Sequence, residues 1–504
     1  LYLNLTKPSR CLYLSHAQSN AQGQAQSPAY LIAMILRMYP KLVIQDSPKD
    51  EISQMQMAQQ ATEILLGGLR KDGEQEQNDG WKELFSWYLR SEEWREQCLR
   101  WIRAAYEGAP ESSIGKAAAV ALYGKELDNS ATELERFAAC AFAHFLQYGL
   151  KIEERQEYEF RQVDLGNVIH QALEQFSRNL KKNRLTWRSL TDQERDQLID
   201  TSVEETIHDY GNTILESSAR NQYMILRVKR ILRRTVWALQ QQLKAGKYEP
   251  SRFEISFSME EDLKASNFQL SEDERLRLRG RIDRVDRYEE DDTIYVKVID
   301  YKSGNTALDL TSVYHGLQLQ LIVYLNAALE LEEKNHPGKH AEPAGMFYYH
   351  VKDPLVDGKP GDEEEEIERK LLEKLKVDGL VRAEEKILKD LDRELEAGKK
   401  SLVIPAAYNK NGSLSSRSKT ASKEQFEELC AYVSDKIREN GTRILGGEME
   451  KNPYKLKQRT ACDYCSFKEI CGFDEKQEGN SFRRLPVFSD EELWKKMREK
   501  GEKE

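Results

Sequence analysis

Hydrophobic residues at alternate positions predict two neighbouring strands in the middle of the chain. Leu276, Leu278 and Ile282 alternate with polar residues in the first, and the same pattern runs over residues 294–298 in the second. Side chains on one face of a strand recur with a period of two, so each strand has one face suited to a core. The acidic stretch 289–292 between them is polar enough to form the turn of a hairpin.

Further elements flank this hairpin. Phe253, Ile255 and Phe257 alternate in the same way and predict a strand before it, and residues 343–351 predict a strand after it. Residues 314–331, between the hairpin and the last strand, are expected to form a helix. The order strand, hairpin, helix, strand predicts an α/β fold with a mixed central sheet flanked by helices.

Helical patterns dominate the rest of the chain. In residues 1–125, tryptophans and other aromatic residues fall near helical spacing, which favours packing in a core over a stacking platform for a ligand. Elsewhere, helices are expected over residues 130–149, 164–176, 218–248, 362–400 and 426–441.

Composition and charge limit the class of protein. With 504 residues, 39% of them hydrophobic, the chain is long enough for about two to four domains. No apolar run reaches the ~18 residues that a membrane span needs, and no signal-peptide pattern begins the chain, so we expect a cytoplasmic protein without a membrane partner. The first residue is Leu1, which indicates a piece of a longer protein. The formal net charge of -10 argues against non-specific coating of nucleic acid but is compatible with local basic channels.

Two acids and a lysine form a candidate site on the predicted hairpin. Asp283 and Asp300 can meet at one end of the sheet, and Lys302 projects to the same face as Asp300 because the two are two residues apart. Such a group costs free energy unless a divalent metal neutralises the carboxylates. Taken alone, an Asp-Tyr-Lys stretch is more often a solvated surface salt bridge, so further motifs must decide.

Four motifs in a fixed order favour the metal site over the surface salt bridge. They are Gly166-x-x-x-His170, Gly280-x-x-Asp283-Arg, Ile299-Asp300-Tyr-Lys302-x-Gly304 and Gln320-x-x-x-Tyr324. This set resembles the ordered motifs of the RecB-type branch of the PD-(D/E)xK nucleases.

The resemblance implies a role for each motif residue. His170, Asp283 and Asp300 would bind Mg²⁺ or Mn²⁺, with the backbone carbonyl of Tyr301 as a further ligand. Asp283, Asp300 and Lys302 would be catalytic. Gln320 and Tyr324 would support the site and contact DNA.

The seven cysteines indicate a reducing compartment and a ligand set. Cys462-x-x-Cys465 and Cys471 are close in sequence, which is typical of a metal or cluster site. Inert thiols and structural zinc are the alternatives; a four-ligand site lacks one residue, for which Cys140 is the candidate. The pattern resembles the iron staple of the same nucleases, which implies one 4Fe-4S cluster held by these four cysteines.

A basic helix is expected over residues 218–248, which contain no acid. Arg227, Arg230 and Arg234 are among its cations. A solvated face with extended side chains and a phosphate-binding face are both compatible with this pattern, and the nuclease motifs favour DNA.

The motifs together resemble the C-terminal part of the B subunits (AddB) of ATP-dependent helicase/nucleases. This implies an all-α, helicase-like remnant over 1–125, a nuclease domain over 126–475 with a charged helical insertion at about 361–400, and a C-terminal tail over 476–504. Because the Gly-x-x-x-x-Gly-Lys-Ser/Thr phosphate loop is absent from the sequence, ATP hydrolysis is expected to come from the partner A subunit.

The implied function is that of a metal-dependent DNA exonuclease in a helicase–nuclease complex. It would cut the 5′-terminated single strand that enters from an unwound duplex end, during end resection and recombinational repair. The alternatives are a non-catalytic DNA-binding scaffold and a CRISPR-associated iron–sulfur exonuclease.

Overall fold

The computed structural model describes residues 2–18, 25–44, 57–70, 80–106, 112–154, 162–209, 218–257, 263–359, 361, 363–476 and 479–501. The chain forms two compact units, Leu1–Ala109 and Pro110–Glu504. The second unit thus begins earlier than the boundary predicted at residue 126.

In its described residues, the first unit has helices and no strand, as expected. Its helices are α1 (Tyr2–Thr6), α2 (Tyr30–Met38), α3 (Ala58–Arg70), α4 (Gly80–Arg90) and α5 (Arg95–Tyr106). Trp81, Trp94 and Trp101 pack around the buried Leu65 and Tyr88. The prediction that the aromatic residues pack in a core is confirmed for these three tryptophans, whereas Trp87 is 50% exposed.

A mixed six-stranded sheet lies at the centre of the second unit, in the order β2-β5-β6-β7-β8-β9. Strands β2, β5 and β6 are antiparallel, β6 and β7 are parallel, and the order continues antiparallel and then parallel to β9. The predicted mixed sheet is therefore confirmed. The strand bounds are β2 (Glu249–Ser256), β5 (Arg281–Glu290), β6 (Thr293–Lys302), β7 (His340–His350), β8 (Asp378–Arg382) and β9 (Thr420–Ala421).

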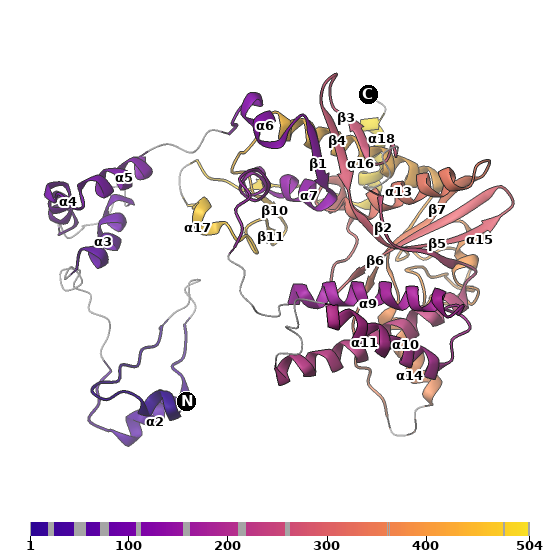
Figure 1. Ribbon diagram of the computed structural model, residues 1–504, viewed down its shortest axis with the longest axis horizontal. Coiled ribbons are helices and arrows are strands. Elements are labelled where there is room, and N and C mark those ends of the chain that lie inside the picture. Colours follow the sequence, from indigo (N-terminus) through magenta and orange to yellow (C-terminus); the bar gives the residue numbers. More distant parts are fainter. Residues whose placement is uncertain are drawn as a thin grey trace. The chain divides into compact units, whose positions relative to one another are not determined.

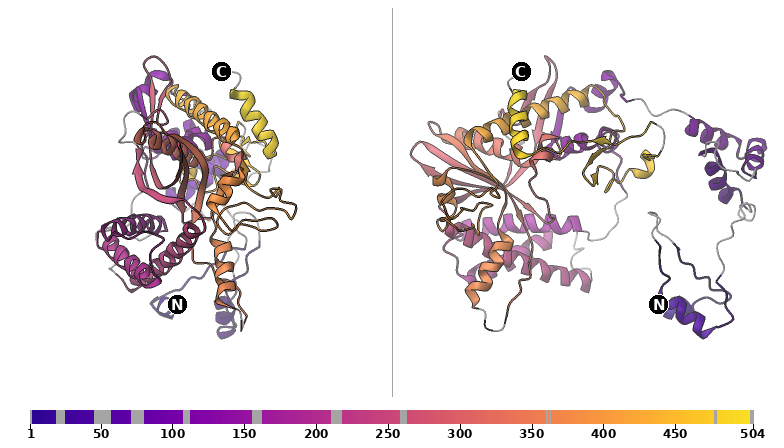
Figure 2. Two further views of the ribbon diagram at one scale, coloured as in Figure 1. Left: turned by 90° about the vertical axis from the view of Figure 1, so that its right-hand side faces the viewer. Right: turned by 180° about the vertical axis from the view of Figure 1, so that it is seen from behind.

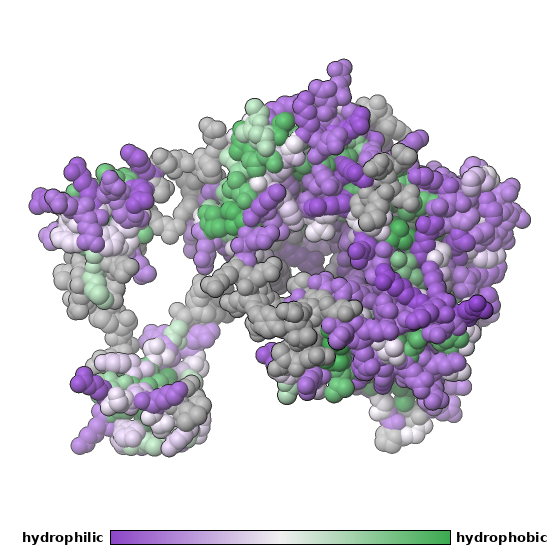
Figure 3. Space-filling view, viewed as in Figure 1, coloured by the Kyte–Doolittle hydropathy of each residue, from purple (hydrophilic) through white to green (hydrophobic). Residues whose placement is uncertain are grey.

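Helices cover both faces of this sheet (Figures 1 and 2). On one face, Ile299, Tyr301 and Phe347 share a core with α9 (Gln162–Lys182), α10 (Asp192–Asp209) and α11 (Ala219–Ala245). On the other, Val296 and Val298 share a core with α13 (Gln320–Asn335), α16 (Lys423–Leu445) and α18 (Asp490–Gly501). On the face seen in Figure 3, the described residues are largely hydrophilic, with apolar patches among them. No helix among the described residues is both long and apolar enough to cross a membrane.

The strand predicted to contain Leu276, Leu278 and Ile282 is two strands. It breaks at Gly280 between β4 (Arg275–Arg279) and β5, and β4 belongs to a separate sheet with β1 (Glu126–Ser130) and β3 (Asn267–Gln269). A Cβ at Gly280 would lie 2.5 Å from the ring of Phe257, so only glycine lets the chain cross here.

Three predicted helices have different bounds. The helix over 314–331 is interrupted after α12 (Leu310–Tyr314) and restarts at Gln320, with Gly316 in a left-handed conformation between them. The helix expected over 130–149 breaks at Cys140, which has extended backbone between α7 (Ala131–Ala139) and α8 (Ala141–His144), and residues 145–149 form a π-helix. Helix α16 continues past Gly441, where a Cβ would lie 2.6 Å from Leu276, so the glycine allows close packing and does not end the helix.

The segment 361–400 is not an all-helical insertion. It contains α14 (Glu364–Leu375) and α15 (Glu385–Leu391), but between them β8 is a strand of the central sheet. The apolar stretch of β8 is too short to predict a strand among its charged neighbours, and its pairing with β7 determines its structure. The segment 476–504 is likewise more than a tail, because α18 buries Leu493, Trp494 and Met497.

Candidate active site

The hairpin of β5 and β6 brings the two motif acids together. Its register pairs Arg284 with Ile299, which places Asp283 beside Asp300. The backbone N–H of Tyr301 donates a hydrogen bond of 2.7 Å to Asp283 Oδ2. Both carboxylates are buried. The predicted convergence of these acids at one end of the sheet is confirmed.

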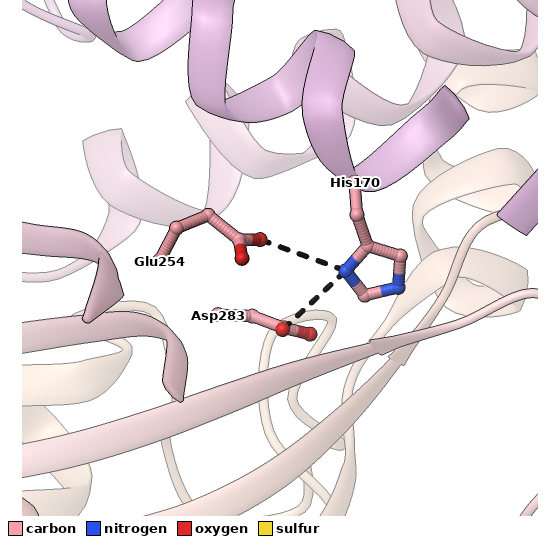
Figure 4. A group of neighbouring side chains, drawn as sticks. All are labelled: His170, Glu254 and Asp283. Atoms are coloured by element: carbon pink, nitrogen blue, oxygen red, sulfur yellow. Dashed lines mark ion pairs between the residues drawn. The ribbon is translucent and has the colours of Figure 1, made fainter. Parts of the chain in front are cut away.

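His170 reaches the same point from α9, and a third acid, Glu254, reaches it from β2 (Figure 4). His170 Nδ1 lies 3.3 Å from Asp283 Oδ1 and 3.7 Å from Glu254 Oε1. The ligand atoms of these three residues all lie within 4.8 Å of one another, close enough to share one metal ion. Among the histidine, cysteine, aspartate and glutamate side chains of the described residues, these three form the group with ligand atoms this close together.

Sequence reasoning missed Glu254. It alternates with Phe253 and Ile255, so the strand pattern assigned it to a polar, solvated face. In the structure its side chain is 6% exposed, and its backbone has a positive φ of 46°, which is costly for a residue with a Cβ. One signal was available: a lone acid inside the apolar stretch 253–257.

The electrostatics of the group favour a bound cation. Burial would lower the pKa of His170, but hydrogen bonds to Asp283 and Glu254 outweigh it and raise the pKa to about 10. Burial and the neighbouring Asp283 raise the pKa of Asp300 to about 7, although Lys302 opposes them. A protonated imidazole here supplies the positive charge that a metal ion would supply to the carboxylates.

Lys302 sits between Asp300 and the start of α13. Its Nζ lies 2.6 Å from Asp300 Oδ2 and donates a 2.8 Å hydrogen bond to Gln320 Oε1. Gln320 Nε2 in turn donates to the hydroxyl of Tyr324 at 2.8 Å. The structure thus brings the predicted support residues and Lys302 into one chain of contacts. Tyr301 lies between Asp300 and Lys302 on β6, and the role of its backbone carbonyl as a metal ligand stays a prediction.

The four motif cysteines line one cavity. Cys140, Cys462, Cys465 and Cys471 enclose about 230 Å³ together with Phe142 and Phe467. Burial and the other three thiols raise the pKa of Cys462 to about 11.

The basic helix α11 has two unlike faces. Lys229 Nζ lies 2.6 Å from Glu204 of α10, and Arg233 likewise pairs with Asp200. Arg227 is exposed, and the Arg230 side chain is 72% exposed.

The exposed face of α11 lies close to the site. Arg230 Nε lies 2.7 Å from Asp353 Oδ2, and Arg234 Nε lies 3.7 Å from Asp353 Oδ1. Asp353 lies two residues after Val351, whose N–H donates a 2.9 Å hydrogen bond to the carbonyl of Lys302. Through Asp353, the side of α11 that carries Arg230 and Arg234 therefore lies next to the end of β6 that carries Lys302.

The mixed sheet with its acids and lysine at one end of two central strands is the architecture of a nuclease family. The chain belongs to the PD-(D/E)XK nuclease superfamily, whose family model matches residues 129–472. The match covers more than half of the chain and includes every residue of the site described above.

Curated relatives extend the similarity to the whole chain. The chain is 41% identical over 511 aligned residues to the B subunit of the ATP-dependent helicase/deoxyribonuclease of Lachnoclostridium phytofermentans, covering 100% of this chain and 43% of the relative. The corresponding B subunits of Clostridium botulinum and Clostridium acetobutylicum are 35% and 32% identical, and the match covers 100% of this chain and 44% of each relative. The chain thus spans less than half the length of these relatives.

Proposed function

We propose that this chain is the nuclease module of a helicase–nuclease complex and hydrolyses phosphodiester bonds of DNA with Mg²⁺ or Mn²⁺. The observation that carries the proposal is the convergence of His170, Glu254 and Asp283 on one point, beside the Asp300–Lys302 pair. The relatives' name, which describes a helicase/deoxyribonuclease, supports it. We infer further that the A subunit of the complex is the partner, that the 5′-terminated single strand is cut during end resection and recombinational repair, and that the complex is cytoplasmic.

The side chains divide the work. His170, Asp283, Asp300 and Glu254, with the Tyr301 carbonyl, would hold the metal, and a divalent ion bound there lowers the pKa of water and polarises a phosphate oxygen. Lys302 supplies positive charge to offset the negative charge that develops on the phosphate. Asp300 and Gln320 hold its Nζ from two sides, so the ammonium does not have to be ordered during the reaction.

We propose that the cavity of Cys140, Cys462, Cys465 and Cys471 holds one 4Fe-4S cluster. The convergence of these four cysteines on one cavity of about 230 Å³ supports the proposal. The cluster would clamp the end of the nuclease domain to its beginning, and closing a loop this long removes on the order of several kcal/mol of unfolded-chain entropy. Serine in place of Cys465 should therefore lower both iron content and thermal stability.

DNA would reach the site along the exposed face of α11. Arg227 is exposed on that face, Arg230 and Arg234 share it and pair with Asp353, and Arg233 pairs with Asp200 of α10. Replacing Arg227 with alanine should raise the KM for single-stranded DNA and reduce the salt dependence of binding by about one unit of slope for the lost phosphate contact. Arg233→Ala is the matched control and should leave this slope unchanged.

The nuclease proposal is tested with end-labelled single-stranded DNA and Mg²⁺ or Mn²⁺. We expect the wild-type chain, alone and with the A subunit, to release labelled products, and chelation of the metal to stop it. Lys302→Ala and Asp300→Ala should abolish cleavage while leaving folding and most DNA binding. Labels placed at the 5′ or the 3′ end separate this activity from that of the A subunit.

Full activity in both folded variants would refute the site assignment. Metal-independent DNA binding without cleavage by the wild type would identify the chain as a scaffold.

A further inference from the structure

A glutamate outside the nuclease motifs contacts the start of α13. Glu135 lies on α7, 184 residues before Leu319 in sequence. Its Oε1 accepts hydrogen bonds from the backbone N–H groups of Leu319 at 2.6 Å and Gln320 at 3.0 Å. The first N–H groups of a helix lack partners within the helix, and α13 has no side-chain cap of its own at Leu319. Glu135 therefore caps α13 from another element.

This cap fixes the residue that holds the lysine. Gln320 is the first residue of α13, so the backbone group bound by Glu135 and the amide bound to Lys302 belong to the same residue. Glu135 thereby limits the position of Gln320, and Gln320 limits the position of the Lys302 ammonium. A negative charge at a helix N-terminus is also stabilised by the helix dipole.

The side chain of Glu135 is partly buried, and its carboxylate depends on the hydrogen bonds that it accepts from α13. Burial raises the pKa of Glu135 to about 7, while the two backbone N–H groups and the charge of Lys302 oppose that rise. Because the carboxylate is removed from water, losing its partners would leave it unsatisfied.

The helix that carries Glu135 ends in the cysteine cavity. The next residue, Arg136, donates a 3.4 Å hydrogen bond to the sulfur of Cys465, and Cys140 follows the last residue of α7. The backbone N–H of Ala141 donates to Asn452 Oδ1 at 3.1 Å, which holds the same end of α7 against the segment that leads to the other cysteines. One nine-residue helix thus contacts both the cysteine cavity and the start of α13.

From this geometry we propose that Glu135 is a positioning residue for the nuclease reaction. It acts on Lys302 through Gln320, and α7 anchors it to the cysteine cavity. The proposal rests on the nuclease function proposed above, and it makes the placement of Lys302 depend on how α7 is seated in the cysteine cavity.

The test compares Glu135→Ala and Glu135→Gln with Glu133→Gln in the full chain. Glu133 is a matched control, because it is a buried carboxylate on the same helix whose polar partners in the described structure are Arg279, at 2.6 Å, and Ser130. We expect Glu135→Ala to lower kcat on single-stranded DNA by roughly 10- to 100-fold with KM within about twofold. Glu135→Gln keeps an acceptor of the same shape and should lose less, whereas Glu133→Gln should retain the wild-type kcat.

A double variant shows whether Glu135 acts through Gln320. If it does, Glu135→Ala combined with Gln320→Ala should lose no more activity than Gln320→Ala alone, because the two residues serve one placement. Iron content is measured in every variant. In Glu135→Gln it should equal that of the wild type, which separates positioning of Lys302 from loss of the cysteine site.

The outcomes separate this proposal from the one on which it rests. A wild-type chain without nuclease activity refutes the proposed function. If the wild type is active, three results would refute the positioning role. They are a wild-type kcat in both Glu135→Ala and Glu135→Gln, a loss of kcat in Glu133→Gln as large as theirs, or a change in KM alone.

Discussion

Arg284 is the neighbour of a site acid, but its predicted role is in folding. It is 1% exposed, and its guanidinium donates to Asp286 through Nε at 2.6 Å and Nη2 at 2.8 Å. The guanidinium also lies 5.0 Å from the ring of Trp187. Because side chains alternate along β5, Asp283 faces the site and Arg284 faces the opposite core.

Replacing Arg284 with methionine keeps most of the volume and removes the charge. Asp286, which is fully buried, would then keep one cation, Lys297 Nζ at 3.2 Å from Oδ2. Breaking a buried ion pair by removing one partner costs about 3–5 kcal/mol, because the remaining charge has lost its compensation. The surviving lysine places the expected loss of unfolding free energy at the lower end, about 3 kcal/mol.

The measurement is equilibrium unfolding in guanidinium chloride, followed by circular dichroism. The chain has two compact units, so two transitions are expected, and the one that coincides with loss of nuclease activity reports the second unit. Arg284→Met should lower its midpoint without changing the slope. The control is Lys339→Met, which removes a surface pair with Glu289 at 2.8 Å on the same hairpin and should cost less than about 1 kcal/mol.

Two results would refute this reasoning. A loss below about 1 kcal/mol for Arg284→Met would show that the buried pair contributes no more than a surface pair. A large fall in kcat for molecules that are still folded would show that Arg284 acts in the site and not in the core.

Two further predictions test the parts of the fold that the sequence did not reveal. Gly379→Ala should destabilise the second unit by more than about 3 kcal/mol in the same unfolding assay, because a Cβ there would lie 2.1 Å from the Met346 carbonyl oxygen. Gly358→Ala is the control and should change the stability little, because the space around Gly358 is open. Equal stability of the two variants would refute the placement of β8 in the sheet. Burial would raise the pKa of Glu439, but Lys500 of α18 and a second lysine lower it to about 2. The stabilising effect of the Glu439 carboxylate is therefore present above the unfolded pKa of about 4.3 and is lost as pH falls toward 2. The difference in unfolding free energy between wild type and Glu439→Gln should be constant from about pH 6 to 8 and should disappear in acid. A difference that grew in acid would contradict the assignment.

The site was predictable from sequence to the extent that its residues lie in short motifs. The spacing of Asp300 and Lys302 places both side chains on one face of a strand, and the paired strands bring Asp283 beside them. Gln320 and Tyr324, four residues apart, share a helix face for the same local reason. Helix α9 was likewise recognisable from the spacing of its apolar residues, but its approach to the hairpin was known only through the family resemblance.

Long-range contacts account for the residues that were missed or misplaced. Glu254 has a strand pattern that assigns it to solvent, and only the approach of α9 makes it a partner of His170. Glu135 shows no motif at all, because its partners are backbone N–H groups far away in the chain. In the same way, β8 lies in a charged stretch that favours a helix, and hydrogen bonds to β7 outweigh that local preference.

The sequence by itself thus determined the fold class, the family motifs and the four cysteines, because alternation, helical spacing and ligand spacing act over a few residues. The tertiary structure decided which strands join the central sheet, which acid completes the group around His170, and what holds the helix beside Lys302. Those contacts join residues from distant parts of the chain, and burial gives them their strength, so no short stretch of sequence contains them.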